Sequence, residues 1–381
     1  MKRTAQAGCG LVLADALGER LADAQPIGTP PAPQKRPREC MFYEKIGRGN
    51  VRCLLCPHHC RVREGQRGDC GVRENQNGTY RTLVYNRYCS FNIDPIEKKP
   101  FYHYLPGTTA ASVATAGCNF TCKFCQNWQI SQSLPEEVRH RPLTTAGLVA
   151  RAVERHVPTI AYTYSEPTVF YEYMHDTAKL GRTRGVGSVI VSNGYMCEDA
   201  TRRLLNHLTA VKVDLKAFTE KFYQDVCGGH LQPVLDNLQV IHSTGIHLEL
   251  VVLLIPTLND GKDEIRKMCE WVVEKLGVDV PIHFSRFHPT YQMKNLPRTP
   301  VKTLEMAREV AVEAGVRYAY VGNVAFHAYG HTYCHACKTK VIERVGYRVE
   351  NNLGEDGKCP KCGAAIPGVW SQKQALAFKP N

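Results

Sequence analysis

The feature that most constrains the fold is a repeat of one strand and one helix through residues 110–325. Apolar or β-branched runs alternate with segments whose apolar residues follow helical spacing. Such a repeat predicts parallel strands joined by crossover helices, which is an α/β fold. The seven predicted strands are Ala111–Thr115, Thr159–Tyr164, Val186–Ser192, Val211–Leu215, His247–Ile255, Ile282–Phe287 and Tyr318–Val321.

The number of repeats favours a full or partial α/β barrel, and a doubly wound open sheet is the alternative. In both architectures the ligand site lies at the carboxyl ends of the strands. Helical spacing also suggests N-terminal caps for three of the intervening helices, at Thr144, Asp199 and Thr303. Polar residues directly after the strands are therefore the first candidates for function.

Composition divides the chain into four segments. A proline-rich stretch ends near residue 38, and we interpret residues 1–38 as a disordered or degenerate leader. A Cys-rich metal-binding segment follows at 39–109, then the barrel at 110–325 and a Cys-rich tail at 326–381. No run of 18 apolar residues occurs, so we expect no transmembrane helix and no membrane partner.

Charge and cysteine content bear on partners and compartment. The net charge of +12 favours acidic partners, although the charges are spread along the chain, so a basic surface without a nucleic-acid role is the favoured interpretation. Of the 17 cysteines, eleven lie in three clusters with metal-ligand spacing. Thiols kept for metal binding indicate a reducing compartment, so we expect a cytoplasmic protein.

The central cluster follows the first predicted strand and has the spacing CxxxCxxC. Its cysteines are Cys118, Cys122 and Cys125. Three thiolates in one short loop suit a 4Fe–4S cube, and they leave the fourth iron open to a small chelating ligand. A structural zinc site with three cysteines and a histidine is the alternative, but no histidine follows within a few residues.

The stretch CNFTCKFCQNW, residues 118–128, resembles the signature of radical-SAM enzymes. The resemblance is to the pyruvate formate-lyase-activating-enzyme-like group, and within it to the AmmeMemoRadiSam system radical-SAM enzymes. It spans about Cys40 to Trp370. It implies a partial (β/α)6 barrel, a 4Fe–4S cluster that binds S-adenosylmethionine (SAM), and a 5′-deoxyadenosyl radical. Phe124 and Trp128 would help to exclude water from the cluster.

Further motifs match the family in chain order. Glu166, in AYTYSEP, resembles the residue that meets the amino group of SAM, and a carboxylate is chemically suited to an ammonium. Ser192 and Asn193 resemble the ribose-contacting segment. Asp214 and Lys216 would hold the SAM carboxylate or ribose, or else form a structural ion pair. His288, Tyr291 and Cys227 are weaker candidates, for which a structural role is favoured.

The two flanking clusters also have metal spacing. The C-terminal pair of CxxC motifs, Cys334, Cys337, Cys359 and Cys362, is typical of a zinc ribbon, with a rubredoxin-type iron as the alternative. The N-terminal cluster is Cys53, Cys56, Cys60 and Cys70, with His58 and His59 as substitute ligands. Tetrahedral zinc is the first interpretation there, and a second, fully ligated iron–sulfur cluster that relays electrons is the alternative.

These features predict an oxidoreductase of the activating-enzyme type. A flavodoxin-like or ferredoxin-like protein would supply the electron for reductive cleavage of SAM, and the radical would abstract hydrogen from an unidentified substrate. Activation of a glycyl radical in a partner protein and modification of a partner protein are two candidates. The alternative is a non-catalytic protein that uses zinc or iron–sulfur sites to bind nucleic acid or protein, and it leaves the strand-end motifs unexplained.

Overall fold

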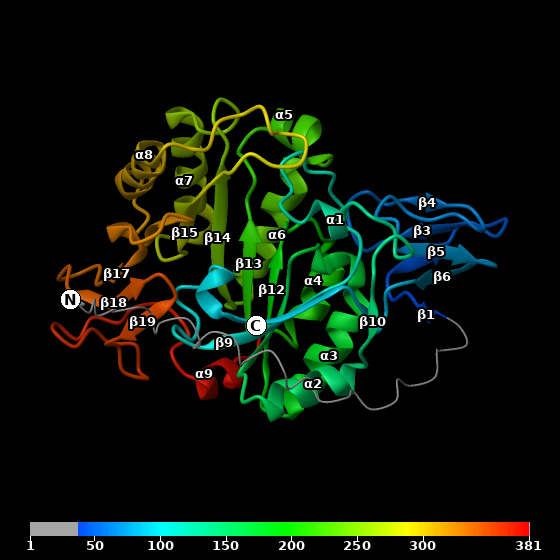
Figure 1. Ribbon diagram of the computed structural model, residues 1–381, viewed down its shortest axis with the longest axis horizontal. Coiled ribbons are helices and arrows are strands. Elements are labelled where there is room, and N and C mark those ends of the chain that lie inside the picture. The colour runs from blue at the N-terminus through cyan, green and yellow to red at the C-terminus, as the bar shows by residue number, and fades with distance from the viewer. Residues whose placement is uncertain (1–36, 381) are drawn as a thin grey trace, which may run out of the picture. The chain divides into compact units, whose positions relative to one another are not determined.

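The computed structural model describes residues 37–380, and one large sheet runs through them (Figure 1). Its strand order is β16-β15-β14-β13-β12-β11-β9-β8. Strands β8 and β9 pair antiparallel, and the other neighbours pair parallel. The strands are β8 (Ser90–Pro95), β9 (Thr109–Ala114), β11 (Thr159–Tyr162), β12 (Gly187–Ser192), β13 (Ala210–Asp214), β14 (His247–Leu254), β15 (Ile282–Arg286) and β16 (Ala319–Gly322). All seven predicted strands are present, which confirms the α/β class with a central parallel sheet.

The sheet has two edges within the described part of the chain, because β8 and β16 do not pair with each other. The pairing is therefore that of an open sheet, and the curvature of a partial (β/α)6 barrel stays a prediction. Strand β8 is an edge strand that the sequence did not predict. Its run Ser-Phe-Asn-Ile-Asp-Pro is polar at every second position and largely solvent-accessible, so it lacks the apolar character of the buried strands.

Helices connect successive parallel strands. They are α2 (Thr145–Glu154), α3 (Tyr171–Thr183), α4 (Glu198–Leu205), α5 (Glu220–Phe222), α6 (Leu231–Ser243), α7 (Lys262–Leu276) and α8 (Val301–Glu313). Each longer helix buries one apolar face; α7, for example, buries Ile265, Met268 and Val272. The 3-10 turn Pro167–Phe170 leads into α3, and the π-helical turn Tyr223–Cys227 follows α5.

One of the three predicted helix caps is confirmed. The Thr144 hydroxyl accepts a hydrogen bond from the backbone N–H of Gly147, as an N-cap side chain does. The predictions for Asp199 and Thr303 were wrong, since both residues lie inside their helices, which begin at Glu198 and Val301. Acidic residues also favour the first helical turn because of the helix dipole, so the sequence does not separate Asp199 as a cap from Asp199 as a first-turn residue.

The N-terminal Cys-rich segment forms two small antiparallel sheets, β2-β3-β4 and β1-β6-β5. Their strands are β1 (Arg38–Glu39), β2 (Tyr43–Lys45), β3 (Val51–Cys53), β4 (Arg61–Val62), β5 (Arg73–Gln76) and β6 (Thr79–Thr82). A buried ion pair joins this segment to α3: Arg73 Nη2 lies 2.5 Å from Glu172 Oε2, and the backbone N–H of Met41 donates to Glu172 Oε1 at 2.8 Å.

Short elements complete the chain. Strand β7 (Arg87–Tyr88) pairs with β10 (Arg141–Pro142), and α1 (Trp128–Ser131) follows the CxxxCxxC loop. The C-terminal segment has the sheet β17-β18-β19, from β17 (Thr332–Tyr333), β18 (Lys340–Val345) and β19 (Arg348–Asn351), and ends with α9 (Gln372–Ala377). Arg344 donates from Nη2 to the Tyr102 carbonyl at 2.7 Å, which ties this sheet to the segment before β9.

The described residues, 37–380, belong to one compact unit. The divisions at 39–109, 110–325 and 326–381 therefore stay predictions about how that unit is organised. Most of the proposed leader, residues 1–36, lies outside the described residues. Across residues 37–380, every helix is too short or too polar to cross a membrane.

We predict that Glu172→Ala lowers the free energy of unfolding by about 3–5 kcal/mol, because it leaves the Arg73 charge buried without its partner. Urea denaturation followed by circular dichroism measures the change. The matched control is Glu198→Ala, which removes an exposed partner of Arg202 and should cost about 0–1 kcal/mol. Equal losses in the two variants would contradict the structural role of the buried pair.

Candidate functional site

A large cavity opens at the carboxyl ends of the parallel strands and has a volume of about 960 Å³. Loops that follow β9, β11, β12, β13, β15 and β16 all contribute to its wall. Of the predicted site residues, Cys118, Cys122, Cys125, Glu166, Asn193, Asp214 and Lys216 line this cavity. The structure thus brings together residues that are spread over about a hundred positions in the sequence, as the strand-end rule predicts.

The CxxxCxxC loop is held by the end of the π-helical turn. The backbone N–H groups of Thr121 and Lys123 donate to the carbonyls of Cys227 and Val226, at 2.8 and 3.0 Å. Two glycines follow at 228 and 229. A Cβ on Gly229 would stand 2.3 Å from the Phe120 ring, so only glycine lets this segment lie against the loop. The loop is therefore fixed by backbone contacts that leave the three thiols facing the cavity.

The three thiols have different electrostatic surroundings. Burial raises the pKa of Cys118 well above its usual value, and the nearby Glu166 charge raises it further. Burial also raises the pKa of Cys125. In contrast, a hydrogen bond with Cys227 and the positive charge of Lys216 lower the pKa of Cys122 against the effect of burial. The favoured interpretation of Cys227 as a small buried residue agrees with its complete burial, and the structure adds a contact with Cys122, a predicted cluster ligand.

This donor set fits the 4Fe–4S cluster that the resemblance implies. Three thiols come from one loop, and all three line a cavity large enough to hold a further ligand on the open side. Phe124 lines the cavity, as expected for a residue that keeps the cluster dry. Trp128 does not line it; the ring stacks on Tyr291 at 5.1 Å between centroids and is 38% exposed. His288 lines the cavity, whereas Tyr291 is used in this stack.

Glu166 is the centre of a buried hydrogen-bond network. Its Oε1 accepts from the N–H and hydroxyl of Thr168 and from the Ser192 hydroxyl, at 3.0, 2.7 and 2.7 Å. Its Oε2 accepts from the backbone N–H of Asn193 at 2.8 Å. Burial raises the pKa of Glu166, and these hydrogen bonds oppose the rise. Since each carboxylate oxygen has two lone pairs, Oε2 keeps one acceptor position for a donor in the cavity.

Ser192 and Asn193 are engaged within the protein. The Ser192 hydroxyl donates to Glu166, and Ser192 does not line the cavity. The Asn193 amide donates to Asn119 Oδ1 at 2.8 Å and accepts from the Tyr195 N–H at 2.9 Å. Their contact with a ribose stays a prediction, and the structure shows a different task for both residues. They position Glu166 and connect it to the CxxxCxxC loop.

Asp214 lies between two lysines. Lys216 Nζ is 2.7 Å from Asp214 Oδ2, and Lys212 Nζ bonds Oδ1. Burial works against ionisation, but the two positive charges hold the pKa of Asp214 below its usual range. Burial lowers the pKa of Lys212. While both lysines are protonated, the single carboxylate between them leaves a net positive charge on the cavity wall, which suits an anionic ligand group. The ion-pair interpretation and the ligand-binding interpretation are therefore compatible at this position.

Lys212 is a site residue that sequence reasoning missed. A signal existed, because Lys212 is charged, lies between Val211 and Val213 in a buried strand, and stands two residues from Asp214 on the same face. Lys99 was also missed. It is 2% exposed, lines the cavity and lies 2.6 Å from Asp94. No sequence signal distinguishes Lys99, because it belongs to a Lys-Lys-Pro run that looks like an exposed turn.

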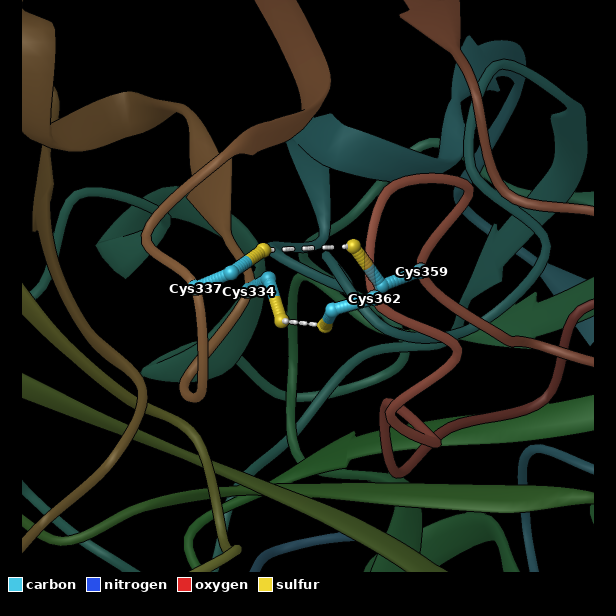
Figure 2. A group of neighbouring side chains, drawn as sticks. All are labelled: Cys334, Cys337, Cys359 and Cys362. Carbon is cyan, nitrogen blue, oxygen red and sulfur yellow. Dashed lines mark hydrogen bonds between the residues drawn. The ribbon is translucent and has the colours of Figure 1, made fainter.

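The four C-terminal thiols form a compact group, and Figure 2 shows them pointing toward one another. Cys334 Sγ lies 3.6 Å from Cys362 Sγ, and Cys337 Sγ lies 3.6 Å from Cys359 Sγ. A tetrahedral ion with bonds of about 2.3 Å to sulfur places its sulfurs about 3.8 Å apart. Hydrogen bonding with Thr339 lowers the pKa of Cys337 to about 6, which favours the thiolate. This group can bind a metal ion, and its identity as zinc stays a prediction.

The N-terminal thiols also gather in one place. The backbone N–H of Cys53 donates to the Cys60 carbonyl at 3.0 Å, and the charges of Cys53, Cys60 and Cys70 each raise the pKa of Cys56, after burial as the main cause. They are less compact than the C-terminal group. Within residues 37–380, the C-terminal group is the only set of three or more ligand residues whose ligand atoms all lie within 4.8 Å of one another.

Comparisons with known proteins agree on one family. The sequence-family model of the Radical SAM superfamily matches residues 112–272. An uncharacterized protein of Methanocaldococcus jannaschii is 43% identical over 331 residues, which are 86% of this chain and 98% of that protein. The pyruvate formate-lyase-activating enzyme of Clostridium pasteurianum is 23% identical over 44% of this chain and 72% of that enzyme.

Solved structures are also similar to parts of this chain. A domain of the pyruvate-formate lyase-activating enzyme from Bacteroides vulgatus has a TM-score of 0.39 and 14% identity, and the match covers 43% of this chain and 98% of that domain. A radical SAM methyltransferase from Sphaerobacter thermophilus has a TM-score of 0.44 and 17% identity, over 57% of this chain and 67% of that protein.

We expect Cys359→Ser to remove about one zinc ion per chain and to lower the thermal midpoint of unfolding, because a four-thiolate site loses a ligand and a segment this small depends on its metal. Elemental analysis and a thermal melt measure both effects. Cys89→Ser is the control, since Cys89 lies outside the three clusters. Loss of iron in place of zinc would instead indicate the rubredoxin-type site, and unchanged metal content would contradict a metal site here.

Proposed function

Because the chain belongs to the radical SAM superfamily and resembles the activating enzyme of pyruvate formate-lyase, we propose that it cleaves SAM reductively and abstracts a hydrogen atom from a substrate. One observation carries the proposal. The three thiols of the CxxxCxxC loop line the same cavity as Glu166, Asp214 and Lys216. A 4Fe–4S cluster held by these thiols, with SAM bound beside it, would supply the one-electron reductive cleavage of SAM to methionine and a 5′-deoxyadenosyl radical.

The residues of this chain have separate tasks in that reaction. Cys118, Cys122 and Cys125 hold three irons. Glu166 accepts a hydrogen bond from the SAM ammonium through the free position of Oε2, since its other acceptor positions are used within the protein. The positive charge shared by Lys212, Asp214 and Lys216 binds the SAM carboxylate.

Water exclusion is the remaining task of the protein. A carbon radical attacks any group within reach, so the wall near the cluster has to be apolar or fully hydrogen-bonded. Phe120 and Phe124 are buried and line the cavity, and Asn119 is buried with its amide bonded to the Tyr195 carbonyl and the Asn193 amide. The loop that binds the cluster thus also provides part of the cavity wall that excludes water.

We propose a partner protein as the substrate, through glycyl-radical activation or another modification. The likeness to the activating enzyme of Clostridium pasteurianum supports this class. The cavity wall supports it too, because Arg286 and Arg298 line it. Arg286 donates from Nε to the Thr299 carbonyl at 2.7 Å, and neither arginine has a carboxylate partner among residues 37–380, so both can pair with acidic groups. A flavodoxin-like or ferredoxin-like protein is the proposed electron donor. The non-catalytic alternative accounts for the thiol clusters but not for this cavity.

The proposal predicts that anaerobically reconstituted, dithionite-reduced protein converts SAM to 5′-deoxyadenosine, and that Cys122→Ala abolishes this. The substitution removes one of three thiolates that hold the cluster. Chromatography of the quenched reaction measures the product, with Cys89→Ala as an active control. Absence of product from iron-loaded wild-type protein, even after addition of cell extract, would overturn the proposed function.

The proposed role of Glu166 predicts weaker SAM binding in Glu166→Gln. Loss of a hydrogen bond to a charged group costs about 1.5–3 kcal/mol, which corresponds to roughly 10-fold to 150-fold in the dissociation constant. Equilibrium dialysis with labelled SAM measures the constant. Glu136→Gln is the control, because Glu136 is an exposed partner of Arg67. Equal affinities in wild type and Glu166→Gln would show that Glu166 acts only within the protein.

A further inference from the structure

We propose that Cys53, Cys56, Cys60 and Cys70 bind a second iron–sulfur cluster, and that this cluster passes electrons to the site at Cys118–Cys125. All four ligands would be protein thiolates, so this cluster has no open iron and its chemistry is one-electron transfer. The metal assignment stands on the N-terminal residues alone. The relay rests on the proposed function of the central site.

The chain brings the four thiols together through two hairpins. Cys53 ends β3 and Cys60 precedes β4, and their backbones are hydrogen-bonded. The second hairpin is the turn at residues 67–74, in which the Gly68 N–H donates to the Arg73 carbonyl at 3.0 Å. It approaches Cys60 at Gly68, where a Cβ would stand 3.6 Å from Cys60 Sγ and 2.5 Å from Tyr80 Oη. Glycine at 68 is therefore required for the loop that carries Cys70 to lie over the first hairpin.

A buried and unsatisfied donor points to an anionic centre at this place. The Arg73 side chain is 1% exposed, and its Nη1 has no hydrogen-bond partner among the described residues. Its Nη2 bonds Glu172, and the thiols of Cys40, Cys53 and Cys70 are among the groups that act on its charge. A buried N–H without a partner costs free energy, so Nη1 needs an acceptor. Thiolates or the inorganic sulfides of a cluster supply one.

The spacing of the thiols favours a cluster over a single zinc ion. The C-terminal thiols have Sγ–Sγ distances of 3.6 Å, as one tetrahedral ion requires. The N-terminal thiols contain no set of three within 4.8 Å, and the same holds for Cys118, Cys122 and Cys125. Thiolates around a cube lie farther apart, because each binds a different iron. Like the central thiols, the N-terminal thiols thus lack the close spacing that a single tetrahedral ion requires.

Direct contacts join the two thiol groups. His58, between Cys56 and Cys60, has its Nε2 2.7 Å from the backbone carbonyl of Asn119, which follows Cys118. A second contact joins the backbones: the Cys70 carbonyl lies so close to Gly117 that a Cβ at 117 would stand 2.8 Å from its oxygen.

Cys60 is partly exposed, which gives an external electron donor access to the N-terminal thiols. In the step we propose, a reduced flavodoxin-like or ferredoxin-like protein loses one electron, the N-terminal cluster carries it, and the central cluster gains it; no bond forms or breaks.

The first test is the metal content of the full chain with Cys118→Ala, Cys122→Ala and Cys125→Ala combined, purified without oxygen. If the inference is correct, this variant keeps about four irons per chain and one zinc, from about eight irons in the wild type. Its electron paramagnetic resonance spectrum after dithionite reduction should show a reduced cluster. No iron and two zincs in this variant would overturn the inference. Four irons in both wild type and variant would support the N-terminal cluster and contradict the central one.

A second variant covers the case in which the triple variant does not fold. Cys56→Ser with Cys60→Ser, in a chain with the central thiols intact, should lose about four of about eight irons. Cys89→Ser with Cys269→Ser is the matched control, because both cysteines lie outside the three clusters, and it should keep all of the iron. Loss of one zinc and no iron from the Cys56/Cys60 variant would overturn the inference.

The relay is tested in a variant that leaves both clusters in place. His58→Phe should keep the iron content and the dithionite-driven formation of 5′-deoxyadenosine, while formation driven by a reduced flavodoxin becomes slower. His59→Phe is the control, because His59 contacts the Cys53 carbonyl and not the central loop. If His58→Phe leaves the flavodoxin-driven rate equal to that of wild type, the electron does not pass through this contact and the relay is wrong, whereas the metal assignment is decided by the iron counts.

Discussion

The alignment of seven parallel strands is the constraint on which the rest of this structure depends. Parallel strands end at one edge of the sheet, so their following loops meet there although they are far apart in sequence. The loop after β9 brings three thiols, the loop after β11 brings Glu166, and the end of β13 brings Asp214. The backbone at this edge also supplies the N–H group of Asn193 that bonds Glu166.

The buried charged side chains at this edge of the sheet have specific partners within the protein. The charge that these partners leave uncompensated determines which charged groups of a ligand can bind there. Glu166 is stabilised by four hydrogen bonds without a cation, which leaves its negative charge available to an ammonium. Asp214 has two lysines, which leaves a positive charge available to a carboxylate. SAM carries both groups on its methionine part, so a single ligand complements both excesses. This complementarity ties the network within the protein to the proposed activity.

The two flanking segments contribute to this centre in different ways. The C-terminal sheet is attached through Arg344 to the stretch before β9, and its thiols are spaced for one metal ion. The N-terminal segment is attached through Arg73 and Glu172 and reaches the central loop through His58. The first segment thus offers a site for one metal ion, and the second makes the contacts on which the proposed electron relay depends.

The sequence by itself determined the class of fold and the ligand types. Strand-and-helix periodicity predicted all seven parallel strands, and cysteine spacing predicted three thiol groups, because both are local patterns. Tertiary structure decided what depends on distant partners. Lys99 and Lys212 line the cavity because of how the chain folds. For the same reason, Ser192 and Asn193 form hydrogen bonds with Glu166. The Trp128 ring stacks on Tyr291 and does not face the cavity. Tertiary structure also decided the distances between the thiols. Those distances depend on how separate hairpins pack, and the number of residues between two cysteines does not determine them.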